Sequence, residues 1–333
     1  FFLLIIGLYS FRADSDNKLF EIARNLDVFA SVIKELDLNY VDEIQPGELI
    51  KKGIDAMLES LDPYTVYIPE SEIEDYKYMT TGQYGGIGAM IQKRGDFVQV
   101  TEVYEGFPAD RFGLRPGDIL LEIEGKSVKN KDVTDISSIL KGQMNTTLKL
   151  KVKRETEGKE LDFSITRDEI KIKSVPYYGL LEDKIGYIKL TGFTMNSSKE
   201  THDAIQEMIN KNNIEALVFD LRDNGGGLLN EAVQIANLFV DKDQLIVTTK
   251  SKYKERNQSY KTNSMPLNTK MPIVFIVNKR SASASEILAG SMQDLDRAVV
   301  IGEKTYGKGL VQNIFPLSYN SQIKITTAKY YIP

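Results

Sequence analysis

Three serines stand at alternate positions in the segment NKRSASASEILAG (278–290), where the apolar run IVFIV gives way to a helix-like pattern. A serine at such a strand-to-helix turn can expose its hydroxyl, and the following amide can stabilise an oxyanion. Ser283 and Glu286 also fit the S-x-x-E pattern of a capping box. The local sequence therefore allows a nucleophile as well as a helix cap, and by itself it favours the cap.

A serine nucleophile needs a base, and histidine is a poor candidate in this chain. His202 is the only histidine, and it lies in SSKETHDAIQEM, a pattern typical of a solvated helix face. The better candidate is Lys308, which stands between two glycines in IGEKTYGKGLVQ. A lysine acts as a base only when neutral, so burial has to lower its pKa. An exposed turn lysine is the alternative interpretation.

The same segment matches most of a phosphate-binding loop, since Gly302 and Gly307-Lys308 fit G-x4-G-K-[ST]. Gly309 stands where a magnesium-binding hydroxyl is required. The following LVQNIFPL is strand-like, whereas a phosphate loop leads into a helix. Nucleotide binding is therefore disfavoured.

The composition excludes further classes of function and binding site. The chain has 333 residues, is 42% hydrophobic and carries a formal net charge of -5, which argues against nucleic acid as a partner. It has no cysteine, which excludes disulfides, a thiolate nucleophile and cysteine-based metal sites. We interpret the apolar residues 1–12 as the remnant of a signal peptide or membrane anchor. The chain ends on the strand-like TTAKYYIP, so we expect further residues beyond it.

The hydrophobic periodicity predicts a multidomain α+β protein. Residues 17–80 read as a helical module interrupted around NYVDEIQPGE, and residues 60–80 are expected to pack on the C-terminal domain, residues 169–333. Residues 84–168 carry short strands, one helix and tight turns, which predict a small barrel or sandwich. Residues 169–333 alternate strands with helices, which predicts a mostly parallel, helix-covered sheet. The segments DLRDNGGG and NKRSASAS both follow strands of that sheet, where ligand sites are expected.

Several segments occur together in a characteristic order: NYVDE, LDPYTVYI, YGGIGAMI, GLRPGDILLEIEGKSV, DLRDNGGG, SASASEILAGSMQD and TYGKGLVQ. In this order they resemble the carboxyl-terminal processing proteases, also called tail-specific proteases. These are serine peptidases with a Ser-Lys dyad and an inserted PDZ domain. The resemblance covers the chain from about Leu19 to Pro333.

The resemblance implies a role for individual residues. Ser283 matches the nucleophile, Lys308 the general base and Gln312 the glutamine that orients the lysine, while Ser281 and Ser285 look like support. The oxyanion hole is expected from the amide of Ala284 and from a glycine, Gly226 or Gly227. In the PDZ part, GGIG matches the loop that holds a substrate carboxylate through its amides; its residues are Gly85, Gly86, Ile87 and Gly88.

The resemblance also implies a setting for the protein. The expected substrates are unfolded or flexible proteins with free apolar C-termini, and no metal, nucleotide or organic cofactor is expected. Export would place the protein in a bacterial periplasm or on the outer face of the inner membrane, and a homodimer and a partner that delivers substrate are further expectations. The alternative is an inactive PDZ-containing adaptor on the same fold. The intact set of Ser283, Lys308 and Gln312 favours the enzyme.

Overall fold

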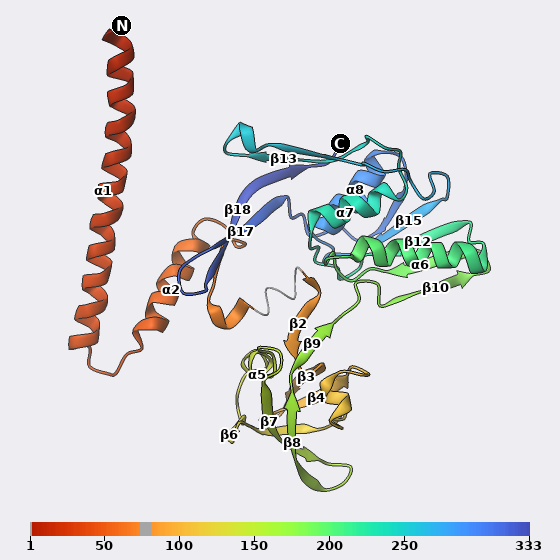
Figure 1. The fold of residues 1–333 in the computed structure, drawn as a ribbon, viewed down its shortest axis with the longest axis horizontal. Coiled ribbons are helices and arrows are strands. Elements are labelled where there is room, and N and C mark those ends of the chain that lie inside the picture. The colour runs from red at the N-terminus through yellow and green to blue at the C-terminus, as the bar shows by residue number, and fades with distance from the viewer. Residues whose placement is uncertain (1, 74–80) are drawn as a thin grey trace. The chain divides into compact units, whose positions relative to one another are not determined.

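The computed structural model describes residues 2–73 and 81–333 (Figure 1). The chain forms two units, Phe1–Tyr67 and Ile68–Pro333. The first unit contains the helices α1 (Phe2–Asn39) and α2 (Pro46–Glu59). The break between them falls where the sequence predicts it, and the proline at the start of α2 suits a position whose amide needs no helical partner. Two short elements follow: β1 (Val66–Ile68) and the 3-10 helix η1 (Glu70–Glu72).

The sequence predicts an export segment in residues 1–12 and a helical module in residues 17–80. Residues 2–12, expected to belong to an export segment, form the start of α1. Across residues 2–73 and 81–333, no helix combines the length and the apolar character that crossing a membrane requires. The end of the expected helical module, 74–80, lies outside the described residues.

The predicted small β domain is present. Its main sheet has the order β3-β4-β5-β7-β8, and β6 pairs with β5. The bounds are β3 (Ala89–Arg94), β4 (Phe97–Val103), β5 (Ile119–Ile123), β6 (Lys126–Ser127), β7 (Thr147–Arg154) and β8 (Lys159–Thr166), with helices α4 (Pro108–Arg111) and α5 (Val133–Leu140). Alternate residues of β4 and β7 point into one apolar core; they include Val98, Val100, Leu148, Leu150 and Val152. A two-stranded ladder of β2 (Gln83–Gly86) and β9 (Asp168–Lys171) flanks this domain along the chain.

The predicted parallel sheet has the order β10-β11-β12-β15-β16. The pairs from β11 to β16 are parallel, and β10 joins one edge antiparallel to β11. The bounds are β10 (Tyr177–Glu182), β11 (Ile185–Lys189), β12 (Ala216–Asp220), β15 (Ile273–Val277) and β16 (Val299–Gly302). The helices between them are α6 (Ser197–Asn212), α7 (Leu229–Asn237) and α8 (Ala284–Asp294).

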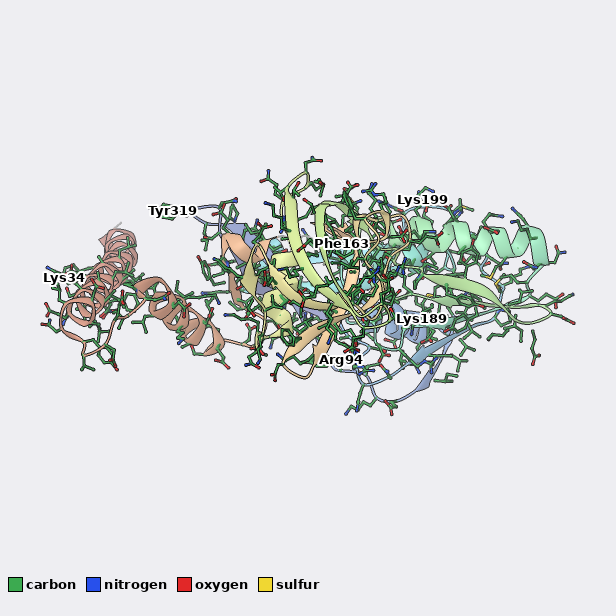
Figure 2. All side chains as sticks on the ribbon, turned by 90° about the horizontal axis from the view of Figure 1, so that it is seen from below. Lys34, Arg94, Phe163, Lys189, Lys199 and Tyr319 are labelled. Carbon is green, nitrogen blue, oxygen red and sulfur yellow. The ribbon has the colours of Figure 1, made fainter. Side chains whose placement is uncertain are left out.

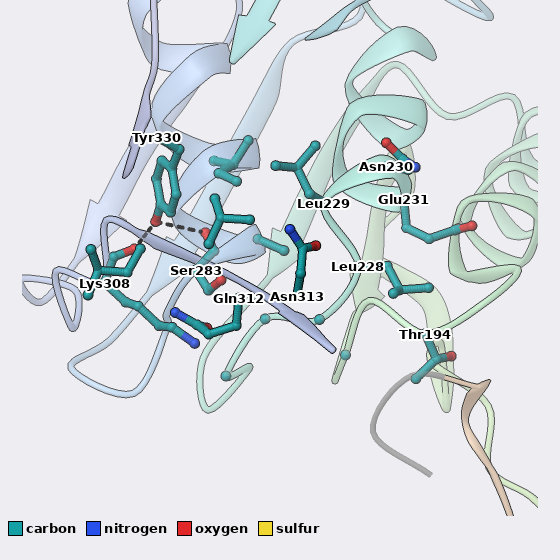
Figure 3. Close-up of a pocket in the computed structure, with 18 of the residues that line it drawn as sticks. Thr194, Leu228, Leu229, Asn230, Glu231, Ser283, Lys308, Gln312, Asn313 and Tyr330 are labelled. Atoms are coloured by element: carbon teal, nitrogen blue, oxygen red, sulfur yellow. Dashed lines mark hydrogen bonds between the residues drawn. The ribbon is translucent and has the colours of Figure 1, made fainter. Parts of the chain in front are cut away.

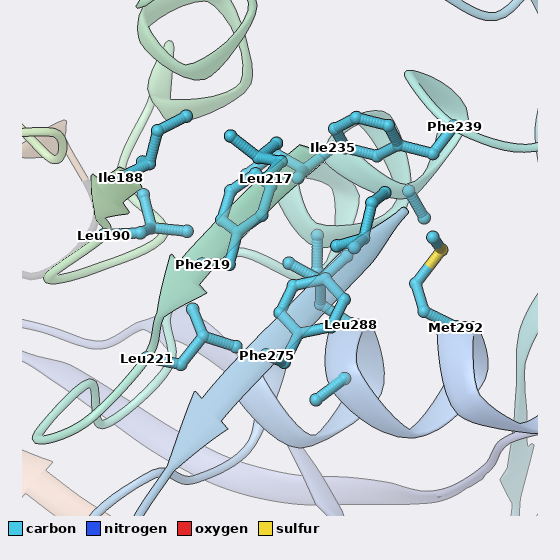
Figure 4. Close-up of a cluster of buried hydrophobic side chains, with 14 of the residues drawn as sticks. Ile188, Leu190, Leu217, Phe219, Leu221, Ile235, Phe239, Phe275, Leu288 and Met292 are labelled. Carbon is cyan, nitrogen blue, oxygen red and sulfur yellow. The ribbon is translucent and has the colours of Figure 1, made fainter. Parts of the chain in front are cut away.

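One face of this sheet packs against the three helices. Phe219 and Phe275 on neighbouring strands stack at 5.2 Å between ring centroids, and Phe239, just after α7, meets Phe219 edge-on at 5.8 Å (Figure 4). All three rings are fully buried, and each contributes roughly 1.5–3 kcal/mol through burial. The core therefore fixes β12 and β15, the two strands whose ends lead into the segments with chemical groups.

A second sheet lies in the same unit and was not predicted as a sheet. Its strands include β13 (Leu245–Ser251), β14 (Gln258–Lys261), β17 (Leu310–Pro316) and β18 (Gln322–Tyr331), and η2 (Lys254–Arg256) lies between the first two. β18 pairs antiparallel with both β17 and β13. Tyr319, in the turn between β17 and β18, is 95% exposed (Figure 2). Since β17 directly follows the lysine segment, this sheet anchors one side of the site.

Candidate active site

The structure gives the three serines different surroundings. Ser281 and Ser285 are fully buried, and their hydroxyls donate to the carbonyls of Leu221 (2.7 Å) and Asn224 (2.9 Å). Ser283 is half-buried and lines a pocket. Its backbone angles, φ 56° and ψ -114°, lie where non-glycine residues are rare and cost about 1–3 kcal/mol. The flanking serines thus tie down a strained turn that presents the middle hydroxyl.

The capping interpretation and the nucleophile interpretation are compatible at Ser283. Ser283 and Glu286 form a capping box at the start of α8, in which the Glu286 carboxylate accepts the Ser283 amide at 2.7 Å. In such a box the serine oxygen acts as an acceptor. A hydroxyl has two acceptor sites and one proton, so capping leaves the proton available to a base.

The pocket beside Ser283 has a volume of about 740 Å³. Its walls come from the segments after β11 and β12, the starts of α7 and α8, and strands β14, β17 and β18 (Figure 3). Lys308 and Gln312 line the same pocket as Ser283. A further lysine of the lining, Lys324 on β18, has its pKa lowered by burial. The predicted nucleophile, base and orienting glutamine are therefore brought to one place.

Lys308 lies in the connection between β16 and β17, and its side chain is half-buried. Gly307 before it has φ 84°, a conformation that favours glycine. Glycine also follows the lysine, and β17 begins at Leu310, where a phosphate loop would need the start of a helix. The structure therefore removes the nucleotide-binding alternative for this segment.

Gln312 lies on β17, and Figure 3 shows its amide beside the end of the Lys308 side chain. Its Nε2 donates to Thr326 Oγ1 at 3.2 Å, across the ladder between β17 and β18. Thr326 was not identified from the sequence, because its contact depends on the register of two strands joined by a hairpin. It holds the glutamine on the pocket side.

The two candidate oxyanion glycines differ. The Gly226 amide donates to Asn224 Oδ1 at 2.9 Å, so it is already engaged. Within the described part of the chain, no acceptor is seen for the amides of Gly227 and Ala284. Gly226 instead allows close approach, since a Cβ there would lie 2.8 Å from the Ser283 Cβ. Gly227 and Ala284 are the pair available to an oxyanion.

Asn224 links this glycine segment to the serine turn and was missed by the sequence analysis. It is fully buried, its Nδ2 donates to the Leu190 carbonyl at 2.9 Å, and its own carbonyl accepts the Ala282 amide at 3.0 Å. Its side-chain Oδ1 accepts the Gly226 amide, so both polar atoms of this buried side chain are bonded and the amide group has one orientation. The only signal in the sequence is its place in DLRDNGGG, directly before the glycines.

The predicted carboxylate loop lies at the start of the small β domain. Gly85 and Gly86 belong to β2 and its ladder with β9, whereas Ile87 and Gly88 follow that ladder. Ile87 is buried in the domain core, and Gly88 has φ 76° with its carbonyl accepting the Tyr104 amide at 2.9 Å. Four consecutive residues thus pass from strand β2 into the short connection that leads to β3.

His202 lies on α6, where its side chain is 43% exposed and its Nδ1 contacts Asp203 at 3.1 Å. The prediction that it is a surface residue is confirmed. It does not line the pocket that contains Ser283.

Comparison with known proteins assigns the chain to a family. Peptidase family S41 matches residues 184–333, and the PDZ domain family matches residues 99–154. A carboxy-terminal-processing protease of Bartonella bacilliformis is 32% identical over 333 residues, which cover 99% of this chain and 75% of that protein. The chain belongs to the carboxy-terminal-processing proteases of peptidase family S41. These are serine-type peptidases, and the resemblance found in the sequence is confirmed.

A second relative and a solved structure support the same family assignment. A probable CtpA-like serine protease of Staphylococcus aureus is 37% identical over 311 residues, which cover 93% of this chain. The chain spans 62% of the length of that relative. The solved structure of a photosystem II D1 C-terminal processing protease is similar with a TM-score of 0.51 and 27% identity, covering 92% of this chain and 88% of the other. The mixed α+β architecture with a PDZ domain is therefore that of the family.

Proposed function

We propose that this protein is a serine endopeptidase of the carboxyl-terminal processing type, with Ser283 as nucleophile and Lys308 as general base. The observation that carries the proposal is the shared pocket: the strained Ser283 turn, the Lys308 side chain and the available amides of Ala284 and Gly227 line one cavity. These are the three components that acyl transfer requires: a nucleophile, a base and oxyanion donors.

The proposed reaction begins when neutral Lys308 Nζ takes the hydroxyl proton of Ser283 as Oγ attacks a peptide carbonyl carbon. The Ala284 and Gly227 amides stabilise the resulting oxyanion, helped by the positive end of α8. The carbon–nitrogen bond then breaks, the leaving amine receives the proton from Lys308, and an acyl-enzyme remains. Water attacks this ester, Lys308 takes a proton from the water, and the proton returns to Ser283 Oγ as the acid product leaves.

The PDZ domain is proposed to select the substrate. The segment from Gly85 to Gly88 would bind the carboxylate of an apolar C-terminus through backbone amides while the peptide pairs with a neighbouring strand. We also propose that the protein acts outside the cytoplasm, as the apolar residues 1–12 and the bacterial relatives suggest. A homodimer and a partner that delivers substrate remain proposals of the same kind.

The test compares full-length wild type with Ser283→Ala, Ser285→Ala and Lys308→Ala on an unstructured protein that ends in small apolar residues. Product masses are measured. Cleavage is expected in wild type and Ser285→Ala and is expected to be lost in the other two. Ser285→Ala is the matched control, because it removes a hydroxyl two positions away that is buried against Asn224. Cleavage by Ser283→Ala would refute the assignment, and binding without cleavage by wild type would favour the inactive adaptor.

A further inference from the structure

The Glu286 carboxylate makes more contacts than a helix cap explains. Its Oε2 accepts the amides of Ser283 (2.7 Å) and Lys308 (2.9 Å). Its Oε1 accepts the Gly307 amide (2.6 Å) and the Thr305 hydroxyl (2.8 Å). Only the first of these four bonds belongs to the capping box. The other three come from the segment that carries the proposed base.

An ionised carboxylate has about four acceptor sites, and hydrogen bonds to it are roughly twice as strong as those between neutral groups. Glu286 is half-buried, and all four of its bonds come from neutral donors. The carboxylate therefore organises the lysine segment around the first turn of α8. Tyr306 adds one more tie, because its amide donates to the Ser281 carbonyl at 3.0 Å.

Tyr330 on β18 holds the same two residues from their carbonyl side. Its hydroxyl donates to the Lys308 carbonyl and, at 3.4 Å, to the Ser283 carbonyl (Figure 3). A phenol has a single proton, so the two carbonyls share it and the longer contact is the weaker. The amides of Ser283 and Lys308 thus meet at Glu286, and their carbonyls meet at Tyr330.

We propose that Glu286 and Tyr330 are positioning residues that hold Ser283 and Lys308 at proton-transfer distance. This inference rests on the proposed Ser-Lys mechanism. Proton transfer needs the two heavy atoms within about 2.6–3.2 Å, and a displacement of about 1 Å can lower the rate about 100-fold. Ser283 lies at the start of helix α8, whereas Lys308 lies in the loop between β16 and β17. Because these two segments belong to different parts of the fold, their relative position has to be fixed by contacts between them. Glu286 fixes it through the main chain of both residues.

The test measures kcat and KM separately for Glu286→Gln and Tyr330→Phe on a peptide substrate with a free apolar C-terminus. A glutamine presents an NH₂ group where two donors converge, so we expect kcat to fall about 100-fold with KM changed less than about twofold. Tyr330→Phe removes only the hydroxyl and should lower kcat about tenfold. In the double variant the losses should not simply multiply, because both residues act on the same pair.

Two matched controls exist in the chain. Glu303→Gln makes the same change on an exposed carboxylate of the same connection, and Tyr331→Phe removes the neighbouring phenol, whose ring contacts Lys250. Both should keep the wild-type kcat. Far-ultraviolet circular dichroism reports folding, and if Glu286→Gln does not fold, Tyr330→Phe and Glu286→Asp carry the test.

The outcomes separate the two proposals. If wild type is inactive or Ser283→Ala still cleaves, the Ser-Lys mechanism fails, and the positioning role fails with it. If wild type cleaves through Ser283 but both Glu286→Gln and Tyr330→Phe keep the wild-type kcat, only the positioning role is overturned. A rise in KM without a fall in kcat would also overturn it, since positioning of the dyad acts after substrate is bound.

Discussion

Ser283 and Lys308 donate their main-chain amides to the same oxygen of Glu286, at 2.7 and 2.9 Å. The proposed nucleophile and base are therefore connected through their backbones, whatever contact their side chains make. The serine turn is in addition fixed from β12, because Ser281 and Ser285 donate to the carbonyls that follow that strand. The site is thus assembled from three chain segments joined by hydrogen bonds.

Gly226 allows the glycine segment to approach the serine turn. Its φ is 101°, and a Cβ would lie 2.7 Å from the Ala282 carbonyl oxygen and 2.8 Å from the Ser283 Cβ. We expect Gly226→Ala to displace Ser283, to lower kcat about 100-fold or more, and to destabilise the fold by about 1–3 kcal/mol. Cleavage kinetics and urea denaturation measure these effects.

The control for that prediction is the adjacent glycine. A Cβ at Gly225 meets nothing within 4 Å, and its φ is not in the left-handed range. Gly225→Ala should therefore keep most of the activity and most of the stability. Equal losses in both variants would show that the segment needs flexibility, and the close-approach argument for Gly226 would then be wrong.

Gln312 is predicted to orient Lys308 while Thr326 holds the glutamine. Gln312→Ala should lower kcat by about tenfold to 100-fold, because the base loses its fixed direction. Thr326→Val keeps the shape of the threonine but removes the hydroxyl bonded at 3.2 Å, and should lower kcat only a few-fold. Steady-state kinetics of the two variants test the order of these effects.

Asn313 serves as the comparison for Gln312. Its Nδ2 donates to Thr327 Oγ1 at 2.7 Å, the same kind of bond between the same two strands, from an exposed side chain. Asn313→Ala should therefore have a smaller effect on kcat than Gln312→Ala. A loss of the same size would indicate distortion of the hairpin instead of a role for Gln312 beside the lysine.

The sequence predicts the local elements of the site well, and the long-range contacts poorly. The strand IVFIV and the helix after it are found as β15 and α8, because each is specified by short-range hydrophobic periodicity. Ser283 and Lys308 were identified from motifs. Glu286, in contrast, was seen only as a capping partner, since its bonds to the lysine segment exist only once the chain has folded.

Tyr330 and the second sheet show the same limit. β13 pairs with both β14 and β18. Its pairing with β18 joins segments far apart in the chain, and no local pattern specifies that register. Tyr330 in the alternation TTAKYYIP reads as an ordinary strand residue. Its hydroxyl reaches the Lys308 carbonyl only because β18 pairs with the strand that follows the lysine.

The proposed carboxylate loop, residues 85–88, leads to a prediction that replacing Gly88 weakens peptide binding. Its φ is 76°, and a Cβ would lie 2.6 Å from the Phe107 Cβ. Gly88→Ala in the Ser283→Ala background, which prevents cleavage, should weaken binding of a labelled peptide with a free C-terminus at least tenfold. Fluorescence anisotropy measures the dissociation constant.

Gly95 gives a control with the same backbone strain and no clash. Its φ is 60°, and a Cβ there meets nothing within 4 Å. Gly95→Ala should bind the peptide as the parent does. A peptide with an amidated C-terminus should bind weakly to either protein, and tight binding of the amidated peptide would contradict recognition of the carboxylate by this loop.

The buried carboxylate of Asp220 should make the free energy of unfolding depend on pH. Burial opposes its ionisation, but hydrogen bonds from Arg222 and Tyr187 outweigh burial and hold the pKa of this carboxyl well below its usual value. A carboxyl with a lowered pKa stabilises the fold above its unfolded pKa, about 3.9, and this contribution is lost as the pH falls below that value. Asp220→Asn should therefore be less stable than wild type at pH 7, by about 1–3 kcal/mol, and the difference should shrink at pH 3.

Urea denaturation followed by circular dichroism at pH 7, 5 and 3 measures this difference. The control is Asp203→Asn, an exposed carboxylate on α6 whose pKa is also lowered by hydrogen bonds, from Lys199 and His202. Because water screens that group, its replacement should change the urea midpoint little at any pH. A difference between Asp220→Asn and wild type that stays constant from pH 7 to pH 3 would mean that the ionised form of Asp220 is not what stabilises the end of β12.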